Sequence, residues 1–131
     1  MTYPFENLEN FTLARLLDRS LELFSDNDSF GNVGEKAMTY AEFHKRVMEM
    51  VKLLKAQGVS KGDRVILLSE NMPNWGVAYF AVTYFGGVIV PVLPDFHPSD
   101  VHRIMEHSGA KAAFASSKQI GRASCREKSV G

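Results

Sequence analysis

Residues 63–115 read DRVILLSENMPNWGVAYFAVTYFGGVIVPVLPDFHPSDVHRIMEHSGAKAAFA, and this stretch decides the fold. It contains three short apolar runs with strand composition, at Asp63 to Ser69, Val88 to Val92 and Ala110 to Ala115. Apolar runs of this length, bounded by turn residues, are typical of buried strands. The sequence therefore predicts three strands in the second half of the chain.

Each predicted strand is separated from the next by a segment that carries helix signals. Pro73 stands where the first turn of a helix accepts proline, and Gly86-Gly87 ends that segment. A second helix is predicted to start at His97-Pro98-Ser99-Asp100 and to end just before Gly109. Strand, helix, strand, helix and strand with short joints predict parallel strands linked by right-handed crossovers, the core of an α/β fold.

An amphipathic helix and a small hairpin are predicted ahead of this core. Thr12 can cap a helix whose apolar positions follow helical spacing as far as Phe24. Two short segments, Ser29 to Val33 and Lys36 to Met38, are predicted to pair across Gly34-Glu35.

A second amphipathic helix follows the hairpin. Thr39 and Glu42 have the spacing of a capping box, and the apolar face that begins at Phe43 ends at Gly58. We expect Glu42 to have this structural role, because no partner carboxylate or histidine at suitable spacing favours acid–base chemistry.

Composition excludes several classes of function. Fifteen Lys and Arg balance fifteen Asp and Glu, so no overall basic field exists to attract nucleic acid. The beginning MTYPFENLENF lacks a signal-peptide pattern, and Gly86, Gly87 and Pro91 break the apolar stretch from Val77 to Leu93. We therefore expect a cytoplasmic protein without a transmembrane segment or a nucleic-acid partner.

The last residues change character after Ser117. The segment Gln119 to Glu127, QIGRASCRE, resembles the translation of a common sequencing adapter. We therefore predict that residues 1–117 are an incomplete N-terminal domain and that residues 118–131 are a non-native tail. A genuine basic tail is the alternative.

Several motifs in order resemble the adenylate-forming enzymes. Met38 to Phe43 (MTYAEF) is similar to their first core motif, and Phe85 to Val92 (FGGVIVPV) to their second. Gly62 to Val65 and Asn71 to Trp75 stand between them at the expected places, and Val92 to Pro98 (VLPDFHP) resembles long-chain fatty acid CoA ligases in particular. The chain is thus identified as an N-terminal fragment of an AMP-binding acyl-CoA synthetase.

The resemblance implies a two-step ligase. ATP and a carboxylic acid, here a fatty acid, would form an acyl-adenylate with the help of Mg²⁺, and the thiol of CoA would then attack the acyl carbon. The family places its phosphate loop, acidic residues and catalytic lysine downstream of Ser117. The resemblance therefore implies no catalytic, cofactor-binding or metal residue here, and an inactive fragment that lacks the remainder of its own chain.

Only one segment is a local candidate for a ligand-facing loop. Asp95, Phe96 and His97 follow a predicted strand at its carboxyl end, where open α/β sheets place their ligands. The competing interpretation is that Asp95 and His97 cap the helix that begins at Pro98.

Other patterns favour structural roles. Residues 31–36 (GNVGEK) lack the spacing of a phosphate loop and fit a hairpin turn. His97, His102 and His107 recur every five residues and so do not share a helix face, which disfavours a metal site. The aromatic residues at helical spacing favour core packing over an acyl pocket; they are Trp75, Tyr79, Phe80, Tyr84 and Phe85.

Two further classes of function stay open from sequence alone. The chain could be a freestanding small α/β module that binds a nucleotide or an acyl ligand, or a fragment with no cellular existence of its own. Saturable ligand binding by the purified chain would favour the first class.

Overall fold

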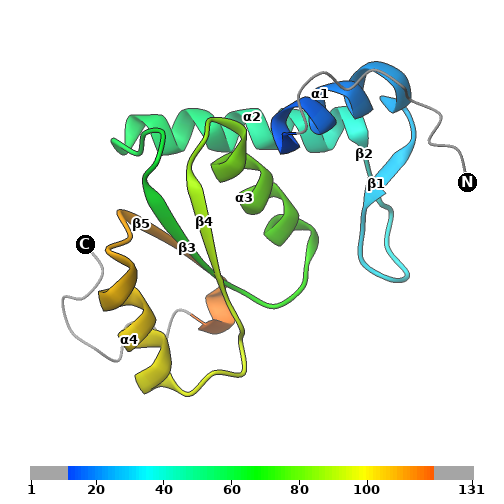
Figure 1. The fold of residues 1–131 in the computed structure, drawn as a ribbon. Helices are drawn as coiled ribbons and strands as arrows, with labels where there is room; N and C mark the ends of the chain where they lie inside the picture. The colour runs from blue at the N-terminus through cyan, green and yellow to red at the C-terminus, as the bar shows by residue number, and fades with distance from the viewer. Residues whose placement is uncertain (1–11, 120–131) are drawn as a thin grey trace, which may run out of the picture.

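A computed structural model describes residues 12–119 of the chain. Its helices and strands are arranged in layers around a small sheet (Figure 1). In chain order they are α1 (Leu13–Phe24), β1 (Asp28–Phe30), β2 (Met38–Thr39), α2 (Tyr40–Ala56), β3 (Arg64–Leu68), α3 (Pro73–Tyr84), β4 (Val88–Val92), α4 (Pro98–Ser108) and β5 (Ala112–Ala115).

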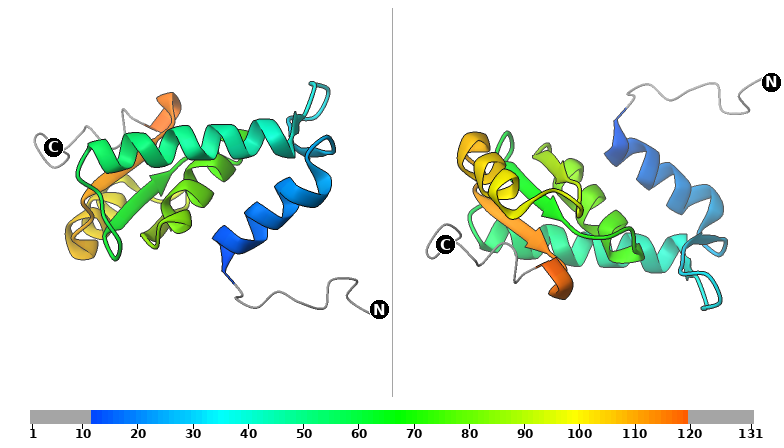
Figure 2. Two further views of the ribbon diagram at one scale, coloured as in Figure 1. Left: turned by 90° about the horizontal axis from the view of Figure 1, so that it is seen from above. Right: turned by 90° about the horizontal axis from the view of Figure 1, so that it is seen from below.

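The three parallel strands form one sheet with β3 at its centre. The strand order is β4-β3-β5, and Ile66 of β3 lies opposite Val90 of β4 and Ala113 of β5. α2 and α3 pack on one face of this sheet and α4 on the other, as the views from above and below show (Figure 2). The predicted β-α-β-α-β core of an α/β fold is confirmed.

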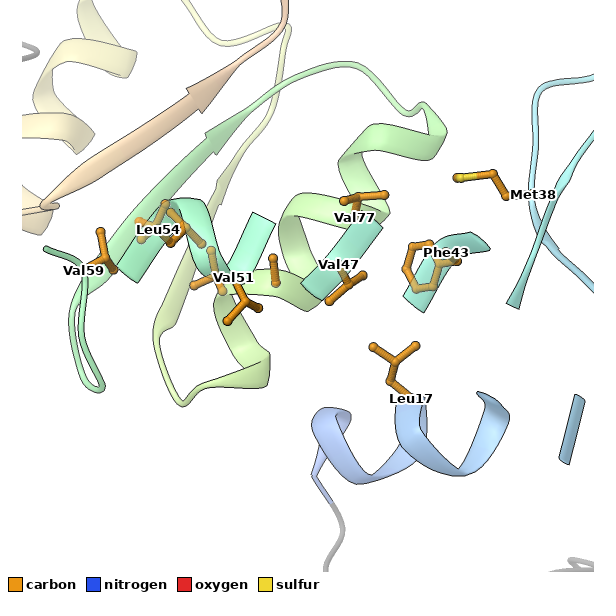
Figure 3. Close-up of a cluster of buried hydrophobic side chains, with 11 residues drawn as sticks. Leu17, Met38, Phe43, Val47, Val51, Leu54, Val59 and Val77 are labelled. Atoms are coloured by element: carbon orange, nitrogen blue, oxygen red, sulfur yellow. The ribbon is translucent and has the colours of Figure 1, made fainter. Parts of the chain in front are cut away.

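Two clusters of buried side chains lie on the two faces of the sheet. Val65 of β3 points into the larger cluster, while Ile66 points into the smaller one together with Val101 of α4. Figure 3 shows the larger cluster, in which Val47 of α2 lies close to Val77 of α3. Burial on both faces explains why β3 is a continuous apolar run, since strands of covered parallel sheets have no solvent face.

α1 begins where its capping residue predicts and packs across α2 and α3. Thr12 Oγ1 accepts a hydrogen bond from Arg15 N at 3.1 Å. Leu17 is the buried residue of α1, and Asp18 beside it accepts a hydrogen bond from the Tyr84 hydroxyl of α3 at 3.0 Å. Apolar and polar contacts therefore both anchor α1.

The hairpin exists, but its strands are shorter than predicted. β1 and β2 pair antiparallel, with Asp28 opposite Thr39 and Phe30 opposite Met38, so residues 31–37 form the connection. Phe30 turns inward against the Phe43 ring, with 4.6 Å between the centroids. The strand pairing stops there because the chain then turns away from the core into an exposed loop.

The predicted capping box at the start of α2 is only half formed. Thr39 Oγ1 accepts a hydrogen bond from Glu42 N at 3.2 Å. Within residues 12–119 the Glu42 carboxylate returns no hydrogen bond, and Thr39 is itself the last residue of β2, paired with Asp28. Thr39 therefore caps α2 on its own, without the reciprocal bond of a complete box.

Two strands start later than predicted because their first residues serve turns. Asp63 Oδ2 accepts a hydrogen bond from Ser60 N at 2.8 Å and lies 3.5 Å from Lys111 Nζ, which ties the starts of β3 and β5 together. Gly109 ends α4 with φ of +63°, in the left-handed region that glycine adopts most readily. β4 has the predicted bounds, and α3 begins at Pro73 as predicted.

Candidate functional site at the carboxyl ends of β3 and β5

The strand order reverses at β3. The chain moves from β3 to β4 on one side, then returns past β3 to place β5 on the other side. Open α/β sheets bind ligands in the crevice outside the carboxyl ends of the strands at such a reversal. The carboxyl ends of β3 and β5 are therefore the place to look for a site.

A groove of about 690 Å³ lies at this place. Its floor includes Leu67 of β3 and Phe114 of β5, and α2 and α3 form its walls. The apolar wall residues are Met50, Leu53, Met72 and Trp75, and Trp75 stacks on Tyr79 with 5.1 Å between ring centroids. The volume lies in the range of small-molecule pockets.

Polar side chains stand at the mouth of the groove. Arg46 and Glu49 project from α2, while Ser69, Ser116 and Ser117 come from the strand ends. Within residues 12–119, neither Arg46 nor Glu49 makes an ion pair or a side-chain hydrogen bond. The groove thus combines apolar walls with one positive and one negative group, neither of which has an ionic partner among residues 12–119.

A polar contact ties together the two loops at the groove. Gln119 Nε2 donates a hydrogen bond to Glu70 Oε1 at 2.9 Å, and Ser69 Oγ donates to Glu70 O at 3.0 Å. The hydrogen bond from Gln119 lowers the pKa of Glu70 below its usual value, with a further contribution from Ser116. Glu70 is therefore a fixed anion where the chain leaves β3.

The predicted ligand-facing residues lie outside this groove, and their contact with a ligand stays a prediction. Asp95, Phe96 and His97 follow β4, are exposed, and do not line the groove. His97 Nδ1 accepts a hydrogen bond from Ser99 N at 3.2 Å and lies 2.8 Å from Ser99 Oγ, so it is the N-cap of α4. The capping interpretation of His97 is confirmed.

The aromatic residues of α3 divide between two roles. Phe80 meets Phe43 edge-on, with ring centroids 5.5 Å apart, and Tyr84 and Phe85 pack against the larger cluster. These three belong to the core, as predicted. Trp75 differs because it lines the groove.

The described part of the chain gives no support to a phosphate loop, a metal site or a membrane-spanning helix. Residues 31–36 form the exposed connection of the hairpin. Residues 12–119 contain no group of three or more His, Cys, Asp or Glu side chains that could hold a metal ion. They also contain no helix of the length and apolar character that crossing a membrane requires.

The comparison with known protein families assigns the chain. The model of the AMP-binding enzyme family matches residues 17–130. The chain belongs to the AMP-binding enzyme family. The resemblance seen in the motifs is therefore confirmed.

Curated relatives of this AMP-binding enzyme chain are CoA ligases. The long-chain-fatty-acid–CoA ligase of Escherichia coli O6:H1 is 30% identical over 102 residues, which are 77% of this chain and 18% of the relative. The 4-hydroxybutyrate–CoA ligase 2 of Metallosphaera sedula is 30% identical over 95 residues, 72% of this chain and 17% of the relative. The chain thus spans less than a fifth of the length of these relatives.

Solved structures share the fold. The anthranilate CoA ligase AuaEII, in complex with anthranoyl-AMP, aligns with a TM-score of 0.85 and 17% identity over 92% of this chain and 23% of that chain. A benzoate CoA ligase from Burkholderia xenovorans LB400 aligns with a TM-score of 0.76 and 25% identity over 87% and 23% of the two chains. The region described here is therefore the first part of the adenylate-forming fold.

Sequence reasoning missed the groove residues at the carboxyl ends of β3 and β5. Ser69 is the last residue of one predicted strand and Ser116 directly follows another, which is a usable signal. Their proximity depends on which strand lies next to β3, and local patterns do not determine this order. The same rule applies to the carboxyl end of β4, which Asp95, Phe96 and His97 follow.

Proposed function

We propose that this chain is the N-terminal part of an ATP-dependent acid–CoA ligase that works through an acyl-adenylate. The family match over residues 17–130 carries the proposal. Further support comes from two relatives, each named a CoA ligase and each 30% identical to this chain. ATP, Mg²⁺, CoA and a carboxylic acid are then the ligands of the whole enzyme, which acts in the cytoplasm.

A fatty acid is the substrate class we favour for the whole enzyme. The relative from Escherichia coli is named a long-chain-fatty-acid–CoA ligase. The segment Val92 to Pro98 resembles the same ligases. Assays of the full-length enzyme with fatty acids of different lengths would give the preferred chain length.

We assign this region a structural role in the ligase. A triphosphate with Mg²⁺ needs several donors and acidic ligands close together. Among residues 12–119 the groove offers one cation, Arg46, and one carboxylate, Glu49, beside apolar walls. This donor set does not fit a nucleoside triphosphate, which supports our proposal that the fragment is inactive and that the catalytic residues belong to the rest of the enzyme.

Sequencing the source DNA beyond the codon for Ser117 is the first test. We expect an open frame that continues into a Ser/Thr/Gly-rich loop with a lysine, and residues 118–131 absent from it. The full-length product should then show fatty-acid-dependent exchange between ATP and pyrophosphate, while the 131-residue chain should show none. A genomic stop codon directly after Gly131 would overturn both the ligase and the adapter hypotheses.

The groove also supports a second candidate, a freestanding binding module. Its volume and apolar walls suit a small amphipathic ligand. Calorimetric titration of the 131-residue chain with AMP and with a fatty acid would test it. Saturable binding by the chain alone would favour the module, and flat titrations would leave the ligase fragment as the better account.

A further inference from the structure

α1 is attached to the rest of the fold through little buried surface. α1 and α3 both have 12 residues, but α3 buries five of them, whereas in α1, which the structure describes in full, only Leu17 is buried. Leu16 and Leu23 stay 39% and 49% exposed. Burial of apolar surface is the main favourable term in helix packing. α1 is therefore held more weakly than α3.

α4 differs from α1, although it also has little buried surface. In α4, which the structure likewise describes in full, only Val101 is buried. The strands β4 and β5 hold both of its ends in the sheet. Within residues 12–119, only the carboxyl end of α1 continues into another element. α1 can therefore separate without breaking the sheet.

Asp18 provides the second attachment of α1. The Tyr84 hydroxyl of α3 donates to its two carboxylate oxygens at 3.0 and 3.2 Å, and His44 Nε2 of α2 lies 3.4 Å from Oδ1. The His44 and Tyr84 rings also meet edge-on, with 6.4 Å between their centroids. One carboxylate thus joins α1 to both helices that it crosses.

Backbone hydrogen bonds fix the point about which α1 can turn. Tyr40 N donates to Asn27 O at 2.9 Å, and Ala41 N donates to Ser25 O at 3.0 Å. These bonds tie the residues just after α1 to the start of α2. They do not involve residues 12–24, so they persist when α1 moves away.

The core keeps its other contacts without α1. Figure 3 shows Leu17 reaching from α1 toward Phe43 and Val47, at one side of the larger cluster. The other members of this cluster come from outside α1, and within residues 12–119 the smaller cluster contains no residue of α1. A helix of 12 residues is marginal in water on its own. α1 should therefore lose its helical structure when it leaves.

We propose that α1 is a lid that opens as a unit of its own, separating from α2 and α3 and unfolding while the sheet stays folded, with Asp18 as its fastening. Opening parts Asp18 from Tyr84 and His44, and it uncovers Phe43, which is 1% exposed in the closed form. The inference does not depend on the proposed function, because every contact that carries it lies within residues 12–119.

Native-state hydrogen exchange of the full 131-residue chain tests whether α1 opens separately. After correction for intrinsic rates, we expect the amides of α1 to exchange about tenfold faster than those of β3, or more, because α1 needs only local opening. Ile66→Val, in the smaller cluster, should speed exchange of β3 several-fold and leave α1 unchanged, since the open and closed forms both contain that cluster. Equal rates in α1 and β3, or an equal response to Ile66→Val, would overturn the inference.

Two alanine variants test the fastening. Asp18→Ala should speed exchange of α1 several-fold. Glu22→Ala is the matched control, because Glu22 is exposed on the same helix and makes no hydrogen bond or ion pair within residues 12–119. Both changes raise helix propensity, so faster exchange in Asp18→Ala reports the lost contact. Tyr84→Phe added to Asp18→Ala should have little further effect, because the two residues share one interaction. Equal α1 rates in the two alanine variants would overturn the role of Asp18.

Discussion

Asp18 is the residue at which three helices meet. Its carboxylate accepts hydrogen bonds from the Tyr84 hydroxyl at 3.0 and 3.2 Å, and His44 Nε2 lies 3.4 Å away. We expect Tyr84→Phe to lower the free energy of unfolding by about 1 kcal/mol, the net value of one hydrogen bond. Urea unfolding at low micromolar concentration measures it. Tyr79→Phe is the matched control, since the Tyr79 hydroxyl makes no hydrogen bond within residues 12–119; equal effects of the two variants would contradict the prediction.

The same pair of residues predicts a pH dependence. Burial, and then the hydrogen bond to Asp18, raise the pKa of Tyr84. A raised pKa means that the folded state favours the neutral phenol, so its contribution is present below about pH 10 and is lost as the pH rises through the raised pKa. The stability difference between the natural chain and Tyr84→Phe should therefore shrink above pH 10. A difference that stays constant into that range would refute the contact.

Gly87 has no room for a side chain. A Cβ atom there would come within 2.8 Å of Val82 O, which accepts the Gly87 N–H. We expect Gly87→Ala to cost about 1–3 kcal/mol, the usual range for overpacking. Gly58→Ala is the comparison, because Gly58 has open space around it and only its φ of +84° opposes a side chain. Thermal denaturation should rank Gly87→Ala as the more destabilised; the reverse order would contradict the packing.

At the scale of elements, Thr39 and Glu42 at the start of α2 do not act together, although the sequence predicted that they would. Only the threonine half of the predicted capping box is formed. We expect Thr39→Ala to destabilise the chain by about 1 kcal/mol, as loss of an N-cap does. Glu42→Ala, which removes the acceptor, should change stability by only a few tenths of a kcal/mol. Urea denaturation of both variants checks this, and a large loss in Glu42→Ala would show that the complete box is formed.

The elements themselves could be predicted because each carries its own local signals. Pro73 begins a helix, Gly109 ends one, and the run at Val88 to Val92 is a strand whatever surrounds it. The hairpin was misjudged in length because the inward turn of Phe30 depends on Phe43, a tertiary contact.

At the scale of the whole molecule, the site depends on relations that no local pattern contains. The prediction that Asp95, Phe96 and His97 face a ligand rests on the rule that ligands bind at carboxyl ends of strands, and it stays a prediction. The rule needs the strand order, and β5 lies beside β3 only because α4 returns across the opposite face. Local sequence patterns therefore could not predict the groove, although they did predict the family.

The open groove and the free β5 edge also predict how the isolated chain behaves. Exposed apolar surface next to an unpaired strand edge promotes association. We expect the mass of the purified 131-residue chain, measured by light scattering, to rise with concentration. Leu53→Glu should reduce this rise because it places a charge at the groove, whereas Val33→Glu, at a more exposed position that does not line the groove, should not. A natural chain that stays monomeric throughout would show that neither surface is adhesive, because both are exposed in the isolated chain.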